Sequence, residues 1–405
     1  MLDIPSVNRL PRLKDYVKST PWYRNDWYDT FSEEMQSPSV ATPDVQSKSQ
    51  GKSRCFELAN SKAVTVLAGR NVDFDAVVDD DKEWIEHAIL RNSSQPCSAE
   101  EEQNWKNDLS KCKVSDEAIL QRTIMMDLIN RHHLQDTLDY TCESQWKCPS
   151  SMPQKKSELA TRMPKPKPDL AVAFRANSLL PTFQQTDLDT LRNIMCPESD
   201  KEDKRDRAFH FLSIEVKGTS GPLGNQVAHR QNFNTATQAL HNIYVFMDLA
   251  GPEALRAFYK KVRFYSVVAT GLVFHVRVHR AIELKKGRIE KSYPLGFVYD
   301  IIHNHQGGDY TKNAATGIIK NILIEYGTKI LQPLLAKTLE KVWDNLQSQQ
   351  DGLADEVEQH RSHGRAASRN GRDASAASRS RKTPSIRGAD TSFTRRELDG
   401  LTVQK

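Results

Sequence analysis

The chain has 405 residues, which is enough for one large domain or two small ones. Hydrophobic residues make up only 38% of it and the mean hydropathy is −0.63, so we expect part of the chain to be unfolded. No apolar run resembles a signal peptide or is long enough to cross a bilayer, and the six cysteines form no CxxC pair. These features predict an intracellular protein of the nucleus or cytoplasm, with reduced thiols and no membrane partner.

The net charge of +5 is unevenly distributed along the sequence. Between His360 and Gly388 there are eight Arg or Lys residues and one acid, whereas the rest of the chain is close to neutral. Residues 348–405 are rich in Ser, Arg, Ala and Gly, which predicts a basic, disordered tail. Three interpretations of this tail stay open: binding of nucleic acid without sequence preference, a nuclear localisation signal, or a solubilising segment.

Taken in chain order, the composition predicts three parts. Residues 1–55 form an N-terminal arm and linker that is partly disordered, residues 56–347 form the folded domain with a helical N-terminal part, and the tail follows. Apolar periodicity predicts helices over 79–90, 115–138, 225–249 and 314–347, and a polar loop over 92–107. Alternating or continuous apolar runs predict strands over 169–174, 210–217, 263–269, 272–279 and 297–302. Gly327 and Pro333 are expected to break the last helix, and Thr270-Gly271 to turn a hairpin.

The strand over 210–217 carries two charged side chains at its end. Alternation along a strand puts Ser213, Glu215 and Lys217 on one face. A carboxylate and an ammonium at the tip of an apolar strand are costly to desolvate unless they are paired or hold an ion. Upstream, Pro168-Asp169 opens a second apolar run, so one acid on a first strand precedes Glu-x-Lys on the next.

This constellation resembles the PD-(D/E)xK nuclease superfamily, over about residues 84–345. The layout also resembles uncharacterised fungal nuclease-like domains of that superfamily, with a Pro-Asp strand, a Glu-x-Lys strand and a Gln-bearing helix in this order. The resemblance implies a restriction-endonuclease-like α/β core, a central mixed sheet flanked by helices. It also implies that Asp169 and Glu215 bind Mg²⁺ or Mn²⁺ and that Lys217 is the catalytic lysine. The 46 residues that separate Asp169 from Glu215 depart from a tight hairpin and imply an inserted charged loop.

Two further residues fit the superfamily's order but have ordinary explanations as well. Glu117 matches the early helical Glu that often joins the metal site, and it equally suits the first turn of a helix. Gln231 matches the polar residue that follows Glu-x-Lys and contacts the water or a phosphate. Gln226 and Asn234 compete for that role, and a solvated helix face is the alternative.

A second group of basic side chains lies on the hairpin. His275, Arg277 and His279 share one face of the strand over 272–279. They form either a strip that follows a nucleic-acid backbone or simply the solvated side of the sheet.

The sequence therefore predicts Mg²⁺-dependent hydrolysis of phosphodiester bonds in nucleic acid, most simply DNA. Asp169, Glu215 and Lys217 act at the site with Gln231, and Glu117 is an added candidate ligand. The alternative is a nuclease-like fold that has lost turnover and binds nucleic acid or a protein partner.

Overall fold

The computed structural model describes residues 63–91, 97–112, 136–146, 164–180, 207–218, 222–284, 294–307 and 310–348, with the isolated positions 121, 128, 129, 191 and 195. Two units are distinguished, Met1–Gln347 and Ser348–Lys405, and everything below concerns the first. The predicted arm and tail lie outside the described residues, as do Glu117 and most of the predicted helix over 115–138. No helix in the described part of the chain is long and apolar enough to cross a membrane.

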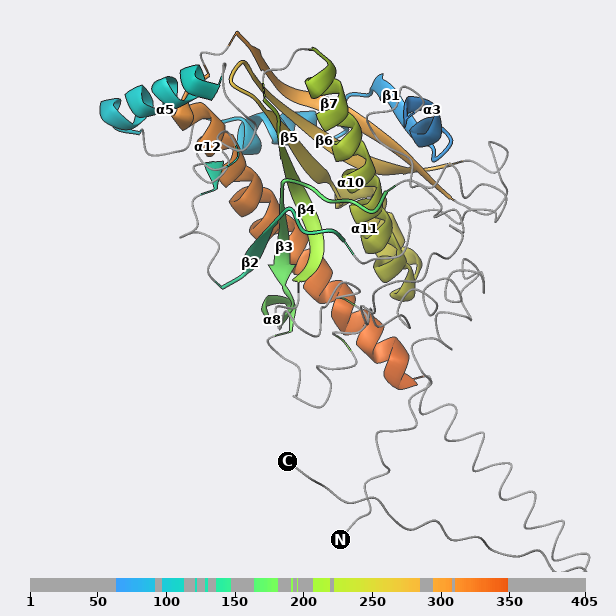
Figure 1. The fold of residues 1–405 in the computed structure, drawn as a ribbon. Coiled ribbons are helices and arrows are strands. Elements are labelled where there is room, and N and C mark those ends of the chain that lie inside the picture. The colour runs from blue at the N-terminus through green and yellow to red at the C-terminus, as the bar shows by residue number, and fades with distance from the viewer. Residues whose placement is uncertain are drawn as a thin grey trace, which may run out of the picture. The chain divides into compact units, whose positions relative to one another are not determined.

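A seven-stranded mixed sheet forms the centre of the fold, in the order β1-β7-β6-β5-β4-β3-β2. Pairing is parallel between β1 and β7 and between β4 and β5, and antiparallel at the other junctions (Figure 1). The strands are β1 Val72–Ala76, β2 Leu138–Cys142, β3 Leu170–Arg175, β4 Arg207–Val216, β5 Phe264–Ala269, β6 Val273–Glu283 and β7 Leu295–Gln306.

Helices cover both faces of this sheet, which confirms the predicted α/β class with helices flanking a central mixed sheet. They are α3 Ala63–Ala68, α4 Lys82–Trp84, the π-helix η2 Ile85–Ile89, α5 Ala99–Cys112, α8 Ala176–Leu179, α10 Pro222–Leu249, α11 Pro252–Lys261, α12 Lys312–Asn321 and the π-helix η6 Ile322–Leu331. The helix continues without interruption through 332–348.

The central strands are buried because helices pack on them from both sides. On one face, Asn232 of α10 meets Ser213 of β4 at 2.7 Å. On the other face, Tyr326 of η6 packs its ring against Tyr265 of β5, with centroids 5.0 Å apart. Every residue of β5 is consequently buried, which explains why its sequence reads as a continuous apolar run.

Several predicted elements agree with the structure. The helix predicted over 79–90 is present as α4 and η2 over 82–89, residues 225–249 lie within α10, and the hairpin of β5 and β6 turns around Thr270 as expected. The strand predicted at 297–302 is present as the longer β7.

Three predictions are wrong. The polar loop expected over 92–107 contains most of α5, whose apolar Trp105 and Leu109 are buried and four residues apart. Leu138, expected to end a helix, begins β2 instead. Gly327 and Pro333 do not break the last helix, which runs through both positions. Gly327 lets this helix approach the core, because a Cβ there would stand 2.7 Å from Cζ of Phe211.

Candidate functional site

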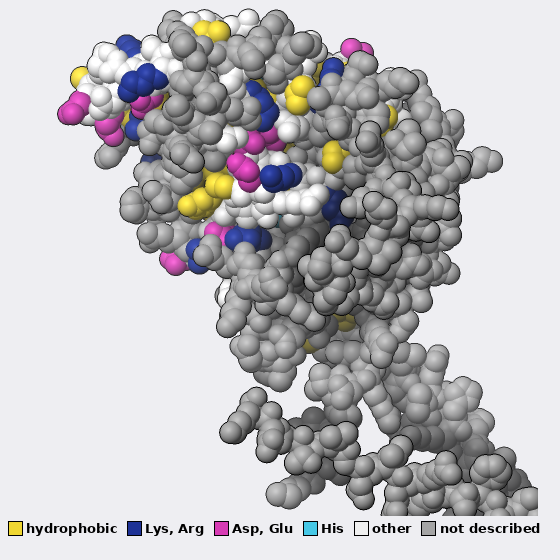
Figure 2. Space-filling model, in the orientation of Figure 1, with side chains coloured by type: hydrophobic (Ala, Val, Ile, Leu, Met, Phe, Trp, Pro, Cys, Tyr) yellow, Lys and Arg dark blue, Asp and Glu magenta, His cyan; other side chains and the backbone are white. Residues whose placement is uncertain are grey.

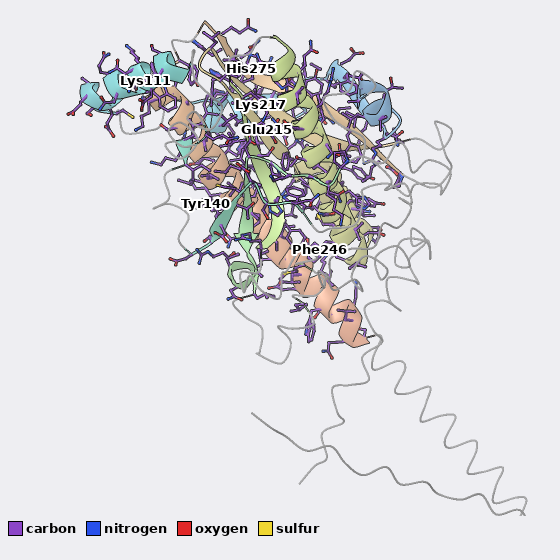
Figure 3. The ribbon with its side chains drawn as sticks, in the orientation of Figure 1. Lys111, Tyr140, Glu215, Lys217, Phe246 and His275 are labelled. Carbon is purple, nitrogen blue, oxygen red and sulfur yellow. The ribbon has the colours of Figure 1, made fainter. Side chains whose placement is uncertain are left out.

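The register between β3 and β4 brings the predicted acids together. Leu170 pairs with Ile214 in the antiparallel ladder, and Asp169 immediately precedes Leu170. Asp169 therefore reaches the end of the ladder beside Glu215, although 46 residues separate them along the chain. Glu215 and Lys217 lie near the centre of the fold in Figure 3.

Direct contacts then fix the positions of these charged groups. The carboxylate of Asp169 accepts hydrogen bonds at Oδ2 from the backbone N–H of Val216, at 2.7 Å, and from Nζ of Lys217, at 3.2 Å. Lys217 Nζ also lies 3.6 Å from Oε2 of Glu215. The lysine thus stands between two carboxylates, and the predicted convergence of Asp169, Glu215 and Lys217 is present in the structure.

Glu215 is the unusual member of this group. Its side chain has no exposed surface, and neither carboxylate oxygen makes a hydrogen bond within the described part of the chain. Burial raises the pKa of the Glu215 carboxyl well above its ordinary value, the charge of Asp169 adds to this rise, and Lys217 opposes it. These surroundings therefore disfavour the charged form of Glu215 relative to its protonated form, compared with the same group in water.

The two acids fit the requirements of Mg²⁺. This ion prefers hard oxygen ligands and is usually held by one or two carboxylates, water and substrate phosphate. A cation would bind the two oxygens of Glu215, which make no hydrogen bond to the described residues. In the described part of the chain, no group of three or more His, Cys, Asp and Glu residues is arranged to hold a metal ion, so an ion here would depend on water and substrate for its remaining ligands.

The polar residues of α10 have distinct environments. Asn234 donates to the carbonyl of Pro164 at 2.9 Å, so its amide is occupied in fixing the chain before β3. Gln231 is partly buried, and its side-chain oxygen has no hydrogen-bond partner within the described residues. Gln226 is exposed. Gln231 therefore has a buried acceptor that no donor of the described residues contacts.

Asn232, which the sequence analysis did not single out, links α10 to the strand that carries Glu215. It accepts from Ser213 at 2.7 Å and donates to the carbonyl of Val267 at 3.1 Å, and it is almost fully buried. Ser213, two residues before Glu215, could have indicated this role of Asn232. If the face of β4 that carries Ser213 is buried, its hydroxyl needs a polar partner from the element that covers it.

The basic residues of β6 do not form a solvated face. His279 is buried and lies 2.7 Å from the hydroxyl of Ser266, and His275 and Arg277 are partly covered by α10. The expectation that these residues form the solvated side of the sheet is therefore wrong, because α10 packs on this side of β6. His229 of α10 stands beside His275 instead.

The fold and this site define an α/β protein whose mixed sheet presents two acids and a lysine on adjoining strands. The chain belongs to the family described as a domain of unknown function, DUF7924, which matches residues 104–323. The matched segment contains Asp169, Glu215, Lys217 and Gln231. No match was found among curated proteins.

Proposed function

We propose that this protein is a Mg²⁺-dependent nuclease of the PD-(D/E)xK type, which hydrolyses phosphodiester bonds in nucleic acid, with DNA as the first substrate to test. The observation that carries the proposal is the convergence of Asp169, Glu215 and Lys217, in which the oxygens of Glu215 make no hydrogen bond to the described residues. A fully buried glutamate in this condition destabilises the folded state, which favours a functional role.

In this proposal Asp169 and Glu215 hold Mg²⁺. When bound, the ion supplies a Lewis acid that neutralises charge on the phosphate and lowers the pKa of water. The backbone N–H of Val216 fixes the orientation of Asp169, so the carboxylate is held ready for an ion.

In this proposal Lys217 contributes a positively charged side chain to the site. Its side chain is held by Asp169 at 3.2 Å and is largely buried, which keeps Nζ in one place. From there it can orient the attacking water and stabilise negative charge that builds on the phosphate. Gln231, with its unpartnered oxygen, can accept a hydrogen bond from the water.

A cleavage assay on supercoiled plasmid, linear duplex and single-stranded DNA tests the proposal. The wild-type protein is incubated with Mg²⁺, Mn²⁺ or EDTA, beside Lys217→Met, Asp169→Asn and the control Lys167→Met. Lys167 forms an exposed ion pair with Glu143, so its loss removes a neighbouring lysine without touching the site.

We expect metal-dependent cleavage by the wild type and by Lys167→Met, and none by the two site variants. Equal rates for wild type and Lys217→Met would contradict the assignment of the lysine. Absence of cleavage of every substrate, with metal-independent DNA binding retained, would favour the alternative of a nuclease-like fold without turnover.

A further inference from the structure

A second polar cluster lies between α10 and β6. It consists of His229 of α10 with His275 and Arg277 of β6. The two imidazoles stack with their ring planes 8° apart and their centroids 5.6 Å apart. Nδ1 of His275 lies 3.5 Å from Nε2 of His229. We call these three residues the His-Arg cluster.

The guanidinium of Arg277 is held in place by aromatic rings. It lies 4.9 Å from the ring centroid of Tyr299 and 5.5 Å from that of Phe233. Contacts of this kind hold a guanidinium by its flat face and leave the N–H groups at its edge available. Nε of Arg277 is buried and makes no hydrogen bond to the described part of the chain.

No negatively charged partner of the cluster is found in the described part of the chain. Among the described residues, no carboxylate forms an ion pair with Arg277, and its pKa is lowered by burial. Burial, followed by the charge of Arg277, lowers the pKa of His229 to about 3, and the same causes lower that of His275 to about 4. Nδ1 of His229 and Nε2 of His275 are buried ring nitrogens that make no hydrogen bond to the residues that the structure describes.

Arg263, which precedes β5, and Arg280 of β6 show how buried arginines are paired in this protein. Arg263 donates to both carboxylate oxygens of Asp79, at 2.7 and 3.0 Å, and Arg280 lies 3.7 Å from the same carboxylate. Buried arginines are ordinarily paired in this way, because an unpaired charge is expensive to desolvate. An acceptor from outside the chain would satisfy Arg277.

The His-Arg cluster and the proposed metal site share one face of the sheet. His275 pairs with Val268 on β5, and Val268 pairs with Glu215 on β4. Cross-strand partners point to the same side, and strands are spaced about 4.8 Å apart, so the Cα atoms of His275 and Glu215 are separated by roughly 10 Å. Figure 3 shows His275, Lys217 and Glu215 close together in projection.

We propose that His229, His275 and Arg277 bind one phosphate group, at a site separate from the proposed metal site. The edge of the guanidinium matches two oxygens of a phosphate, and each imidazole can donate from one ring nitrogen. The group can belong to inorganic phosphate or to the backbone of a nucleic acid. This proposal does not require the acids and Lys217 to be catalytic.

The test follows thermal unfolding in EDTA while inorganic phosphate replaces chloride at constant ionic strength. The proteins are the wild type, Arg277→Met, His275→Gln and the control Arg256→Met, whose arginine is exposed on α11. Because only the folded state has the site, phosphate should raise the melting temperature of the wild type and of the control. Arg277→Met should fold normally, since it removes a partly buried charge that no carboxylate of the described residues neutralises, and should lose this response.

For His275→Gln we expect a phosphate dissociation constant about tenfold weaker than that of the wild type, the usual effect of losing one hydrogen bond to a charged group. If Arg277→Met fails to fold, His275→Gln alone decides, and a response equal to the wild type would overturn the proposal. No phosphate response in the wild type would overturn it directly.

A parallel titration with a short oligonucleotide in EDTA distinguishes the two sources of phosphate. If the backbone is the ligand, the oligonucleotide binds, and the salt dependence of binding falls by about one phosphate contact in Arg277→Met. If inorganic phosphate binds and the oligonucleotide does not, the site takes a free phosphate. Because no metal is present, these outcomes are independent of the cleavage assay.

Discussion

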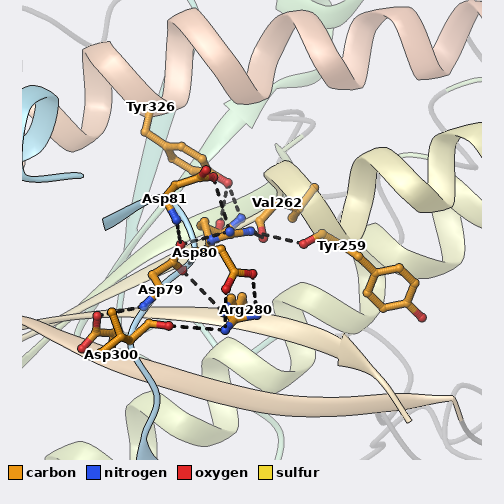
Figure 4. Close-up of polar contacts among 10 residues, drawn as sticks. Asp79, Asp80, Asp81, Tyr259, Val262, Arg280, Asp300 and Tyr326 are labelled. Carbon is orange, nitrogen blue, oxygen red and sulfur yellow. Dashed lines mark hydrogen bonds and ion pairs between the residues drawn. The ribbon is translucent and has the colours of Figure 1, made fainter. Parts of the chain in front are cut away.

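Asp79 and Glu215 both carry buried carboxylates, but they differ in their hydrogen bonds. One oxygen of Asp79 accepts a hydrogen bond from Nε of Arg263 at 2.7 Å, and the other accepts one from a second nitrogen of the same guanidinium at 3.0 Å. The backbone N–H of Asp81 also donates to Asp79, at 2.9 Å (Figure 4). Glu215 has one ammonium at 3.6 Å and no hydrogen bond within the described residues.

The contacts around Asp79 indicate a structural role. Its partner Arg263 immediately precedes β5. The backbone N–H of Arg263 donates to the hydroxyl of Tyr326 of η6, and this hydroxyl donates to the backbone carbonyl of Arg263 at 2.7 Å. Asp300 of β7 accepts the backbone N–H of Asp79 at 3.0 Å. The network therefore ties the segment after β1 to two strands and to a helix.

The difference shows where this fold gains stability and where it loses some. Breaking a buried ion pair that is fully hydrogen-bonded is destabilising. A buried charge that makes no hydrogen bond to the described residues, such as Glu215 with the ammonium of Lys217 at 3.6 Å, lowers stability while it is charged. The two acids should consequently respond to substitution with opposite signs, and the following experiments test this comparison.

The largest effect is expected for Arg263→Ala. The substitution leaves the Asp79 carboxylate buried without its main partner, and breaking a buried pair in this way costs about 3–5 kcal/mol. Urea unfolding of the variant and of Arg256→Ala, which loses an exposed arginine, measures the free energy of unfolding. A loss below about 1 kcal/mol would be typical of an exposed pair and would contradict the structural role.

A gain is expected for Glu215→Gln at alkaline pH without metal. Because burial and Asp169 raise the folded-state pKa of Glu215 above 4.5, the folded state binds more protons than the unfolded state, so stability falls as pH rises from about that value toward the raised pKa. Removing the charge should recover about 1–3 kcal/mol at pH 8, the cost of an unsatisfied buried polar group.

Urea unfolding at pH 4, 6 and 8 in EDTA measures this effect. The difference between Glu215→Gln and wild type should be smallest at pH 4 and grow with pH. Glu143→Gln, which removes an exposed acid, is the control. A difference that is the same at all three pH values would show that Glu215 is not held in this way.

The charged residues at the ends of β3 and β4 were easier to predict from the sequence than the environment of the face of β6 that α10 covers. Asp169, Glu215 and Lys217 were accessible to prediction because a strand alternates its side chains and because Pro168 favours an extended chain into Asp169. Their mutual distances depend on the register of β3 and β4, which no local pattern encodes.

The environment of β6 could not be predicted because it depends on which helix covers it. His279 and Arg277 alternate with apolar residues, a pattern typical of a solvated face. In the structure α10 covers that face, and Asn232 and His229 meet polar groups of the sheet there. The apolar periodicity of α10 does not predict which face of the helix packs on β6, because polar residues such as Asn232 and His229 also face the sheet.

The smallest of the three effects is the response to Mg²⁺, which tests whether the unsatisfied oxygens of Glu215 are a ligand site. At a concentration ten times the dissociation constant, Mg²⁺ should stabilise the wild type by about 1.4 kcal/mol. The response should increase with pH, because the ion competes with the proton on Glu215. Asp169→Asn removes one of the two acids and should abolish the response, whereas Glu143→Gln should keep it. An equal response in the wild type and Asp169→Asn, at matched ionic strength, would place the ion elsewhere and leave Glu215 as a buried acid without a ligand.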